Sequence, residues 1–208
     1  SNMVLSYLFN KGEFKNDGTD FTPGPCHRLD RNTSGLVVFA KNINSSQKMM
    51  DLFKTHDEIK KTYLALLNGV TEENGTINAP LLKDENEGFV KVSSLANGAK
   101  TAITEYKKIK DNGEYSLVEA TLITGRTHQL RVHFSYIGHP ILGDQKYGNF
   151  KENKRFEENF KYRYQFLHAY KLKFGNIEGE LNYLSNKEFI GPLTKKDQDI
   201  LKTLNLLK

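Results

Sequence analysis

The sequence contains one cysteine, Cys26, and no apolar run that approaches the roughly 20 residues a helix needs to cross a bilayer. A single cysteine excludes an internal disulfide and cannot build a cysteine-based metal cluster. The N-terminus lacks the basic and apolar regions of a secretory leader. We therefore expect a cytoplasmic protein that does not span a membrane, in which Cys26 is a small packing residue.

Positively charged residues are only slightly in excess of negatively charged ones. The 30 Lys and Arg residues outnumber the 25 Asp and Glu residues, which gives a net charge of +5 and an isoelectric point near 9.1. This balance is compatible with a polyanionic partner but does not identify one. The length of 208 residues and the 38% hydrophobic content predict one globular domain over residues 3–208. Ser1 and Asn2 resemble residues left by tag removal and are set aside.

The stretch HRLDRNTSGL at residues 27–36 places a carboxylate, Asp30, between Arg28 and Arg31. Nearby positive charge favours the ionised carboxylate, which suits a nucleophile or an anchor for a cation. The alternative is an ordinary surface ion pair in a polar turn. A short apolar run at residues 36–40 follows, and its branched and aromatic side chains predict a buried strand that begins at this turn.

Hydrophobic periodicity and turn residues indicate the other elements. Asn112-Gly113 separates two strand-like segments and predicts a long antiparallel hairpin, which excludes a simple series of βαβ units. Thr194 should cap a C-terminal helix whose buried face includes Leu207. The predicted helices cover residues 4–10, 44–56, 127–137, 151–164 and 194–207, and the predicted strands cover 36–40, 60–67, 75–78, 89–93, 99–109, 115–123, 165–174 and 180–184.

The stretch TGRTHQLRVH at residues 124–133 combines a tight turn with the start of a helix. Thr127 is placed to cap that helix, and Arg126 then lies in the turn beside backbone N–H groups that suit an anion. The anion is either a backbone phosphate or the carboxylate of Asp30. A plain loop arginine is the structural alternative.

Several blocks between residues 22 and 175 occur in the order found in one enzyme family. HRLDRNTSGL resembles the signature of the RluA-type RNA pseudouridine synthases, residues 60–67 resemble their second motif, and TGRTHQLRVH resembles a third. Residues 138–148 and the Leu-His-Ala core of the strand at 165–174 extend the resemblance. It implies the α/β catalytic-domain fold of that family, a mixed α+β domain with a largely antiparallel central sheet flanked by helices. The strand that usually precedes this domain, and any RNA-binding domain, are expected to be absent.

The resemblance also implies roles for particular residues. Asp30 would be the catalytic nucleophile, which attacks the sugar or abstracts a proton from it. Tyr63 would lie against the target base, as an aromatic ring with basic neighbours can. Arg126 would pair with Asp30, and Arg28 would occupy the space left by the flipped uridine. The other expected substrate-binding residues are His27, Thr33, Thr127, His128 and Leu167.

The reaction implied is the isomerisation of a uridine in structured RNA to pseudouridine, by a monomer that needs no cofactor and no metal. Ribosomal RNA is favoured over transfer RNA as the partner. His128 and His133 lie five residues apart without an evident third ligand, so no metal site is expected. One alternative is a non-catalytic RNA-binding module on the same scaffold. Another is a hydrolase with an aspartyl nucleophile, which would need a second acid or a metal cluster.

Overall fold

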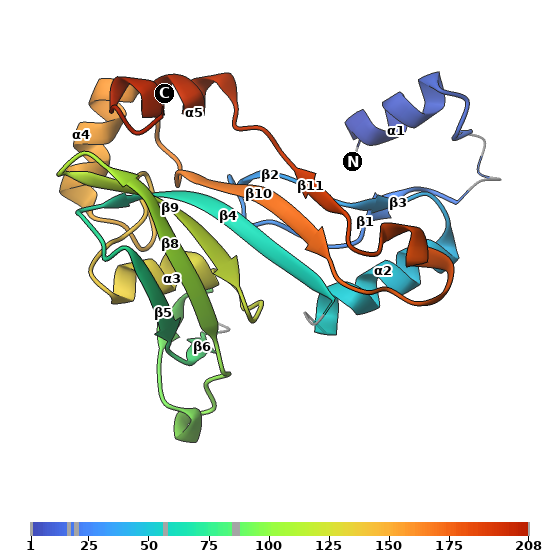
Figure 1. Cartoon of the computed structure of the whole chain (residues 1–208), viewed down its shortest axis with the longest axis horizontal. Helices are drawn as coiled ribbons and strands as arrows, with labels where there is room; N and C mark the ends of the chain where they lie inside the picture. Colours follow the sequence, from blue (N-terminus) through green and yellow to red (C-terminus); the bar gives the residue numbers. More distant parts are fainter. Residues whose placement is uncertain (1, 16–17, 19–20, 56–57, 85–87, 208) are drawn as a thin grey trace.

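The computed structural model describes residues 2–15, 18, 21–55, 58–84 and 88–207. At its centre lies a seven-stranded sheet, in which six strands follow the order β11-β10-β4-β9-β8-β5 and β2 pairs with β10 (Figure 1). Only the pair of β2 with β10 is parallel among the described strands of this sheet. The predicted mixed fold with a largely antiparallel sheet is confirmed. The strands are β2 (Ser34–Gly35), β4 (Ile59–Asn68), β5 (Asn74–Asn78), β8 (Ile103–Asp111), β9 (Tyr115–Leu122), β10 (Leu167–Phe174) and β11 (Glu188–Ile190).

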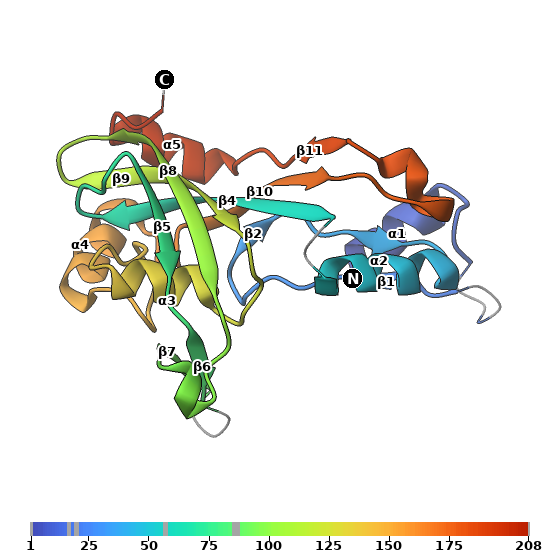
Figure 2. The same ribbon diagram turned by 60° about the horizontal axis from the view of Figure 1, so that its bottom comes forward.

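The central strand β4 is apolar on both faces because helices cover both of them along part of its length. Ala65 pairs with Val118 of β9 on the face that carries α3 (Gln129–Tyr136). Leu66 points to the opposite face, where it packs with α4 (Phe150–Phe160) and α5 (Lys195–Thr203). Figure 2 shows α3 on one side of the sheet and α5 on the other. Burial on two faces explains why the sequence of β4 does not alternate strictly.

The predicted hairpin is formed by β8 and β9. Asn112 accepts the backbone N–H groups of Glu114 and Tyr115 through Oδ1, at 3.1 and 2.8 Å. Gly113 has a φ of 84°, a conformation that glycine adopts without steric cost. The local turn chemistry therefore determines this hairpin, as the sequence predicts.

The opposite end of the sheet is covered by α2 (Ile43–Thr55), which contributes Met49 and Phe53 to a second core with the end of β10. This helix begins one residue earlier than predicted because Asn42 Oδ1 accepts the N–H of Ser45 at 2.8 Å. His56, expected at its end, lies outside the described residues. The first helix, α1 (Asn2–Asn10), confirms the prediction for residues 4–10. None of the described helices is long and apolar enough to cross a membrane.

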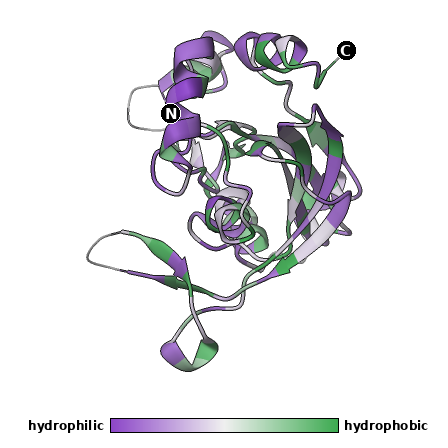
Figure 3. Cartoon of the chain, turned by 90° about the vertical axis from the view of Figure 1, so that its left-hand side faces the viewer, coloured by the Kyte–Doolittle hydropathy of each residue, from purple (hydrophilic) through white to green (hydrophobic). Residues whose placement is uncertain are grey.

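A short antiparallel pair projects from the body of the protein. It consists of β6 (Leu81–Lys83) and β7 (Val90–Val92), which we call the arm. Figures 2 and 3 show these two strands extending away from the central sheet. The sequence predicts β7 but not β6. A 3-10 turn, η1 (Leu95–Asn97), follows the arm and leads toward β8.

Residues 36–40 do not form the single buried strand that was predicted. The chain instead contributes β2 to the edge of β10 and then β3 (Phe39–Ala40), which pairs with β1 (Gly24–Pro25) in a separate sheet. Gly35 explains the break, because its φ is 114° and a Cβ at this position would overlap the backbone of Ala169. Val37 between the two strands is 38% exposed. The close crossing over β10 turns the chain before a longer strand can form.

Two predictions near the C-terminus are wrong in detail. Residues 180–184 lie in a 3-10 helix, η2 (Gly179–Leu184), and the strand that follows is β11. Thr194 caps α5 as predicted, since its Oγ1 accepts the N–H of Asp197 at 3.1 Å. However, the helix ends at Thr203 and a turn follows, so Leu206 is buried whereas Leu207 is 37% exposed.

Candidate active site

A cavity of about 940 Å³ lies against the α3 face of β4. All nine residues that the sequence predicts for the site line it, and they come from four parts of the chain: the loop before β2, strand β4, the turn before α3, and strand β10. The complete lining is Pro25, Cys26, His27, Arg28, Leu29, Asp30, Arg31, Thr33, Met50, Phe53, Lys54, Lys61, Tyr63, Lys83, Leu122, Gly125, Arg126, Thr127, His128, Gln129, Leu130 and Leu167.

Asp30 sits in a tight turn at the edge of this cavity. Its backbone carbonyl accepts the N–H of Thr33 at 3.0 Å, and Asn32 adopts a positive φ of 69° to close the turn. Asparagine tolerates this conformation better than most residues. The side chain of Asp30 is 26% exposed, so the carboxylate is accessible from the cavity while its backbone is held.

The guanidinium partner of Asp30 is Arg131, whose Nη1 lies 3.7 Å from Oδ2 of the aspartate. Arg131 is buried in α3 and also forms a bidentate pair with Asp144, with Nε–Oδ2 and Nη2–Oδ1 distances of 2.7 and 2.8 Å. Burial by itself would lower the pKa of Arg131, but the hydrogen bond and charge of Asp144 and the charge of Asp30 raise it above its ordinary value. The guanidinium therefore stays charged between two carboxylates.

Asp144 is held as an anion by the same pair. Its burial acts to raise the pKa of the carboxyl, but the hydrogen bonds and charge of Arg131 and the backbone N–H groups of Lys146 and Tyr147 lower it below its ordinary value. Those N–H groups donate to Oδ1 at 2.9 and 3.1 Å. A buried carboxylate with this many donors is fully compensated.

The expected pair between Arg126 and Asp30 is not formed, and this is a correction to the sequence analysis. Arg126 is exposed and its Nε donates to the carbonyl of Thr101 at 3.0 Å. The physical reason is the start of α3, which begins only at Gln129, so that Arg126 stays in the turn while Arg131 faces inward. Arg126 remains part of the cavity lining.

Thr127 does not cap α3, contrary to the prediction. The residue before the helix is His128, which has a φ of 55° and no side-chain capping bond. Gln129 orders the turn instead, because its Oε1 accepts the N–H of Arg126 at 3.0 Å and the hydroxyl of Thr124 at 2.9 Å. Thr127 is therefore an exposed residue at the cavity rim.

Tyr63 points from β4 into the cavity with small residues on either side. Its cross-strand partners are Ala120 of β9 and Ala169 of β10, which leave room beside the ring. Burial first, and then the negative charge of Asp30, raise the pKa of the Tyr63 hydroxyl above its ordinary value. The hydroxyl is therefore protonated at neutral pH. Leu167, which is buried in β10, adds apolar surface to the same wall.

His27 and Thr33 line the cavity, but their polar atoms are engaged in holding the loop. His27 stacks on Phe53 with ring centroids 4.2 Å apart, and its Nε2 accepts the N–H of Val38 at 3.1 Å. Burial and then the charge of Lys61 lower the pKa of His27 to about 4, so the ring is neutral near pH 7. Thr33 Oγ1 accepts a hydrogen bond from Gln165 at 3.2 Å.

Four residues of the site were not singled out from the sequence: Lys61, Arg131, Asp144 and Tyr147. Lys61 lines the cavity, and burial lowers the pKa of its ammonium group to about 8. Arg131 could have been identified from the sequence, because an arginine on the predicted buried face of a helix requires a buried anion as its partner. Tyr147 lies in the loop after α3, and its hydroxyl is 2.9 Å from Nδ1 of His128.

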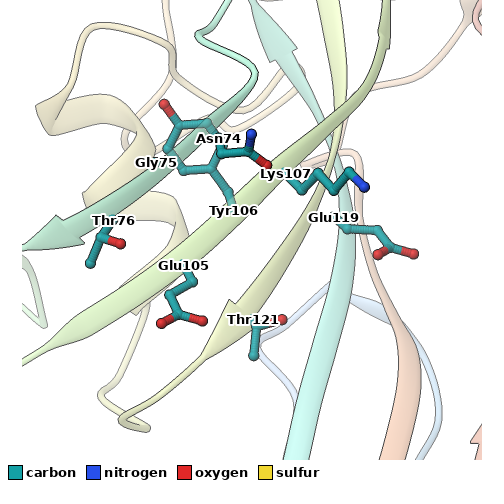
Figure 4. Close-up of a pocket in the computed structure, with 8 residues that line it drawn as sticks. All are labelled: Asn74, Gly75, Thr76, Glu105, Tyr106, Lys107, Glu119 and Thr121. Atoms are coloured by element: carbon teal, nitrogen blue, oxygen red, sulfur yellow. The ribbon is translucent and has the colours of Figure 1, made fainter.

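A second hollow of about 310 Å³ lies on the sheet itself, between β5, β8 and β9 (Figure 4). It contains none of the residues predicted for the site. Lys107 and Glu119, which line it, are cross-strand neighbours, as are Glu105 and Thr121. No group of three or more His, Cys, Asp or Glu residues suited to a metal ion occurs among the described residues. The cavity at Asp30 is therefore the better candidate for chemistry.

Comparisons with known proteins agree on one enzyme family. The model of the family described as RNA pseudouridylate synthase matches residues 8–136. A Chloroflexus aurantiacus protein named as an uncharacterised RNA pseudouridine synthase is 36% identical over 189 residues, which cover 90% of this chain and 55% of that protein. The solved structure of human RNA pseudouridylate synthase domain containing 4 is 25% identical, covers 98% of this chain and 83% of the human chain, and superposes with a TM-score of 0.76.

Relatives named for two kinds of RNA are similar to this chain. tRNA pseudouridine synthase C of Vibrio parahaemolyticus is 36% identical over 161 residues, which cover 72% of this chain and 65% of that protein. Ribosomal large subunit pseudouridine synthase C of Vibrio cholerae is 36% identical over 175 residues, which cover 84% of this chain and 49% of that protein. The chain thus spans about half to two thirds of the length of these curated relatives.

Proposed function

The chain belongs to the RNA pseudouridylate synthase family, and we propose that it converts a uridine of RNA into pseudouridine with Asp30 as the nucleophile. One observation carries this proposal. The carboxylate of Asp30 lies at the edge of a cavity that also contains Tyr63, and it is paired with the buried cation Arg131. A carboxylate, an aromatic ring and a cation are thereby gathered from three separate segments.

The reaction is an isomerisation, so its atoms balance without a co-reactant. The bond between N1 of uracil and C1′ of the ribose breaks, the base turns, and a bond forms between C5 and C1′. The proton on C5 is lost and N1 gains one. Asp30 can begin the sequence by attacking C1′ or by abstracting a proton from the sugar, and both routes require its ionised form. Arg131 supplies the positive charge that favours this form.

Tyr63 is suited to hold the uracil ring while it is detached from the ribose. Its ring lies on the cavity wall with Leu167, and a base can stack on an aromatic side chain. Because burial raises the pKa of its hydroxyl, the phenolate is scarcely populated at neutral pH. The tyrosine therefore acts first as a packing surface, and any help with the C5 proton comes second.

RNA would be held at the rim of the cavity by cationic side chains. Arg28, Arg31 and Arg126 are exposed there, and Lys54 is 75% exposed. Contacts with phosphates supply much of the affinity for nucleic acids and weaken as salt rises. Arg28 adjoins Asp30 and is the candidate to fill the space that the flipped uridine leaves in the RNA.

Ribosomal RNA is the substrate we favour, and transfer RNA is the alternative. The match to the relative named for the ribosomal large subunit extends over 175 residues, whereas the match to the relative named for tRNA extends over 161 at the same 36% identity. The experiment below includes both kinds of RNA.

The test is release of tritium from RNA labelled at C5 of uracil, with the chain and its Asp30→Asn variant. Unmodified ribosomal and transfer RNA transcripts serve as substrates. We expect release by the parent chain from at least one RNA and no release by the variant, with RNA binding little changed in both. Release by Asp30→Asn would contradict the nucleophile assignment. Binding of RNA by the parent without any release would favour a binding module on the same scaffold.

A further inference from the structure

The hydroxyl of Tyr147 joins the wall of the cavity to the arm. It accepts the backbone N–H of Val90 in β7 at 3.0 Å, and it lies 2.9 Å from Nδ1 of His128. Tyr147 itself is half-buried in the loop after α3. One oxygen therefore contacts two segments that are far apart in the sequence, one in the cavity lining and one outside it.

The protons of this contact can be assigned from the donors present. The N–H of Val90 must donate, so the hydroxyl accepts there and keeps its own proton for His128. Nδ1 of His128 is then an acceptor, and the ring carries its proton on Nε2. The opposite tautomer would leave the hydroxyl proton of Tyr147 without this partner. The neutral Nε2–H form is therefore the one that satisfies all three groups.

Burial of His128 also favours the neutral ring. It lowers the pKa of His128, and the charges around the ring partly offset one another: Asp30 and Asp144 act to raise the pKa, whereas Arg131 and Lys146 act to lower it. The net direction is downward. At neutral pH the ring is consequently uncharged, which leaves Nδ1 free to accept the bond from Tyr147.

The ring of Tyr147 contacts the guanidinium that faces Asp30. The central carbon of Arg131 lies 5.1 Å from the ring centroid, and a cation over a tyrosine ring is attracted to its face. Asp144 holds the same guanidinium through two hydrogen bonds. The tyrosine ring and the carboxylate together limit how Arg131 can turn relative to Asp30.

The two residues that lead into β7 of the arm, Gly88 and Phe89, contact the same loop. Lys146 Nζ donates to the carbonyl of Gly88 at 2.7 Å and lies 4.1 Å from the ring centroid of Phe89. Phe89 also meets the ring of Tyr147 edge to face, with centroids 5.8 Å apart. The arm and the loop of Tyr147 therefore form one contact region beside the cavity.

We propose that Tyr147 is a positioning residue. Its hydroxyl selects the Nε2–H tautomer of His128, and its ring orients Arg131 toward Asp30. Its hydrogen bond to Val90 makes both of these effects depend on the position of the arm. The consequence for substrate binding is an N–H donor in the cavity lining, which suits the carbonyl oxygens of a pyrimidine base. This role rests on the proposed function, but the tautomer can be measured without RNA.

The first experiment is ¹⁵N NMR of the full chain labelled at histidine, without RNA, near neutral pH. We expect His128 to show an unprotonated Nδ1 and a protonated Nε2 in the parent chain. Tyr147→Phe keeps the ring over Arg131 and removes the hydroxyl, so the Nδ1 signal should move toward that of a tautomer mixture. The matched control is Tyr115→Phe, which removes a different hydroxyl, the one bonded to Arg155. A parent chain with Nδ1 protonated, or an unchanged signal in Tyr147→Phe, would overturn the assignment.

The second experiment measures turnover of the RNA that the parent chain modifies. Tyr147→Phe should lower kcat by about tenfold, because the hydrogen bond that fixes His128 is lost, with KM little changed. Tyr147→Leu removes the ring as well and should lower kcat further, because Arg131 then loses the ring that it packs against. The control Tyr115→Phe should match the parent. Parental kcat in Tyr147→Phe would refute the positioning role. Absence of turnover in the parent would refute the proposed function alone, and the NMR result would then decide the tautomer.

Discussion

Arg131 and Asp144 form a buried bidentate ion pair, and the remaining Nη1 of the same guanidinium lies 3.7 Å from Asp30. One cation thus serves two carboxylates that differ in exposure, since the side chain of Asp144 is 1% exposed and that of Asp30 is 26% exposed. The buried carboxylate fixes the position of the guanidinium. The accessible carboxylate lines the cavity.

The first prediction distinguishes the role of Arg131, in α3, from that of Arg126, in the turn before it. Arg131→Ala should lower turnover by about 100-fold, because the transition-state charge loses its fixed cation. Arg126→Ala should leave the turnover of bound RNA near that of the parent and weaken RNA binding, with a salt dependence of binding that is reduced by about one phosphate contact.

Turnover rates at saturating RNA, together with RNA titrations at several salt concentrations, would check this pair of variants. Arg131→Ala also leaves Asp144 buried without its partner, which costs about 3–5 kcal/mol of stability. Arg131→Lys, which keeps a charge, controls for that loss. A loss of turnover of about 100-fold in Arg126→Ala but not in Arg131→Ala would contradict the pairing seen in the structure.

The second prediction concerns acid stability and His27. The pKa of this histidine is about 4 in the folded protein, below its ordinary value of 6.5, because burial and Lys61 disfavour the charged ring. A depressed pKa means that the unfolded state binds the proton more readily, so the contribution to stability is complete above pH 6.5. It is lost as pH falls from about 6.5 to about 4.

Urea unfolding at several pH values would measure this effect, with each unit of pKa difference worth about 1.4 kcal/mol. His27→Phe should flatten the decline of stability over that range, because no proton is then taken up on unfolding at this position. The variant keeps an aromatic ring against Phe53. An equal decline in the parent and in the variant would show that other groups govern acid unfolding.

The third prediction tests the crossing of the chain over β10. Gly35→Ala should destabilise the protein by about 3 kcal/mol, since it adds a Cβ where φ is 114° and where the backbone of Ala169 leaves no space. Gly24→Ala is the matched control, because nothing lies within 4 Å of its Cβ position. Thermal and urea unfolding of both variants would compare them. Equal stability of the two would mean that the crossing can relax.

Local chemistry explains the predictions that the structure confirms. The hairpin of β8 and β9 follows from Asn112 and Gly113, and the start of α5 follows from the cap at Thr194. Each depends on atoms within three residues of one another. Turn and capping preferences act over such distances, so they can be recognised before the fold is known.

Residues 36–40 show where local reasoning fails. Their composition is that of a buried strand, but Gly35 must pass close to Ala169, which is more than 130 positions later in the chain. The pairing of Asp30 has the same origin, because the choice between Arg126 and Arg131 depends on where α3 begins and on the position of Asp144. Neither constraint is local.

The sequence by itself determined the family, the antiparallel character of the sheet and nine of the residues that line the cavity, because motifs, turns and periodicity are short-range properties. Only the tertiary structure decided which arginine faces Asp30 and how Tyr147 joins His128 to the arm. These pairings depend on distances between segments that meet after folding. Charge and residue type alone allow more partners than the folded chain brings within reach.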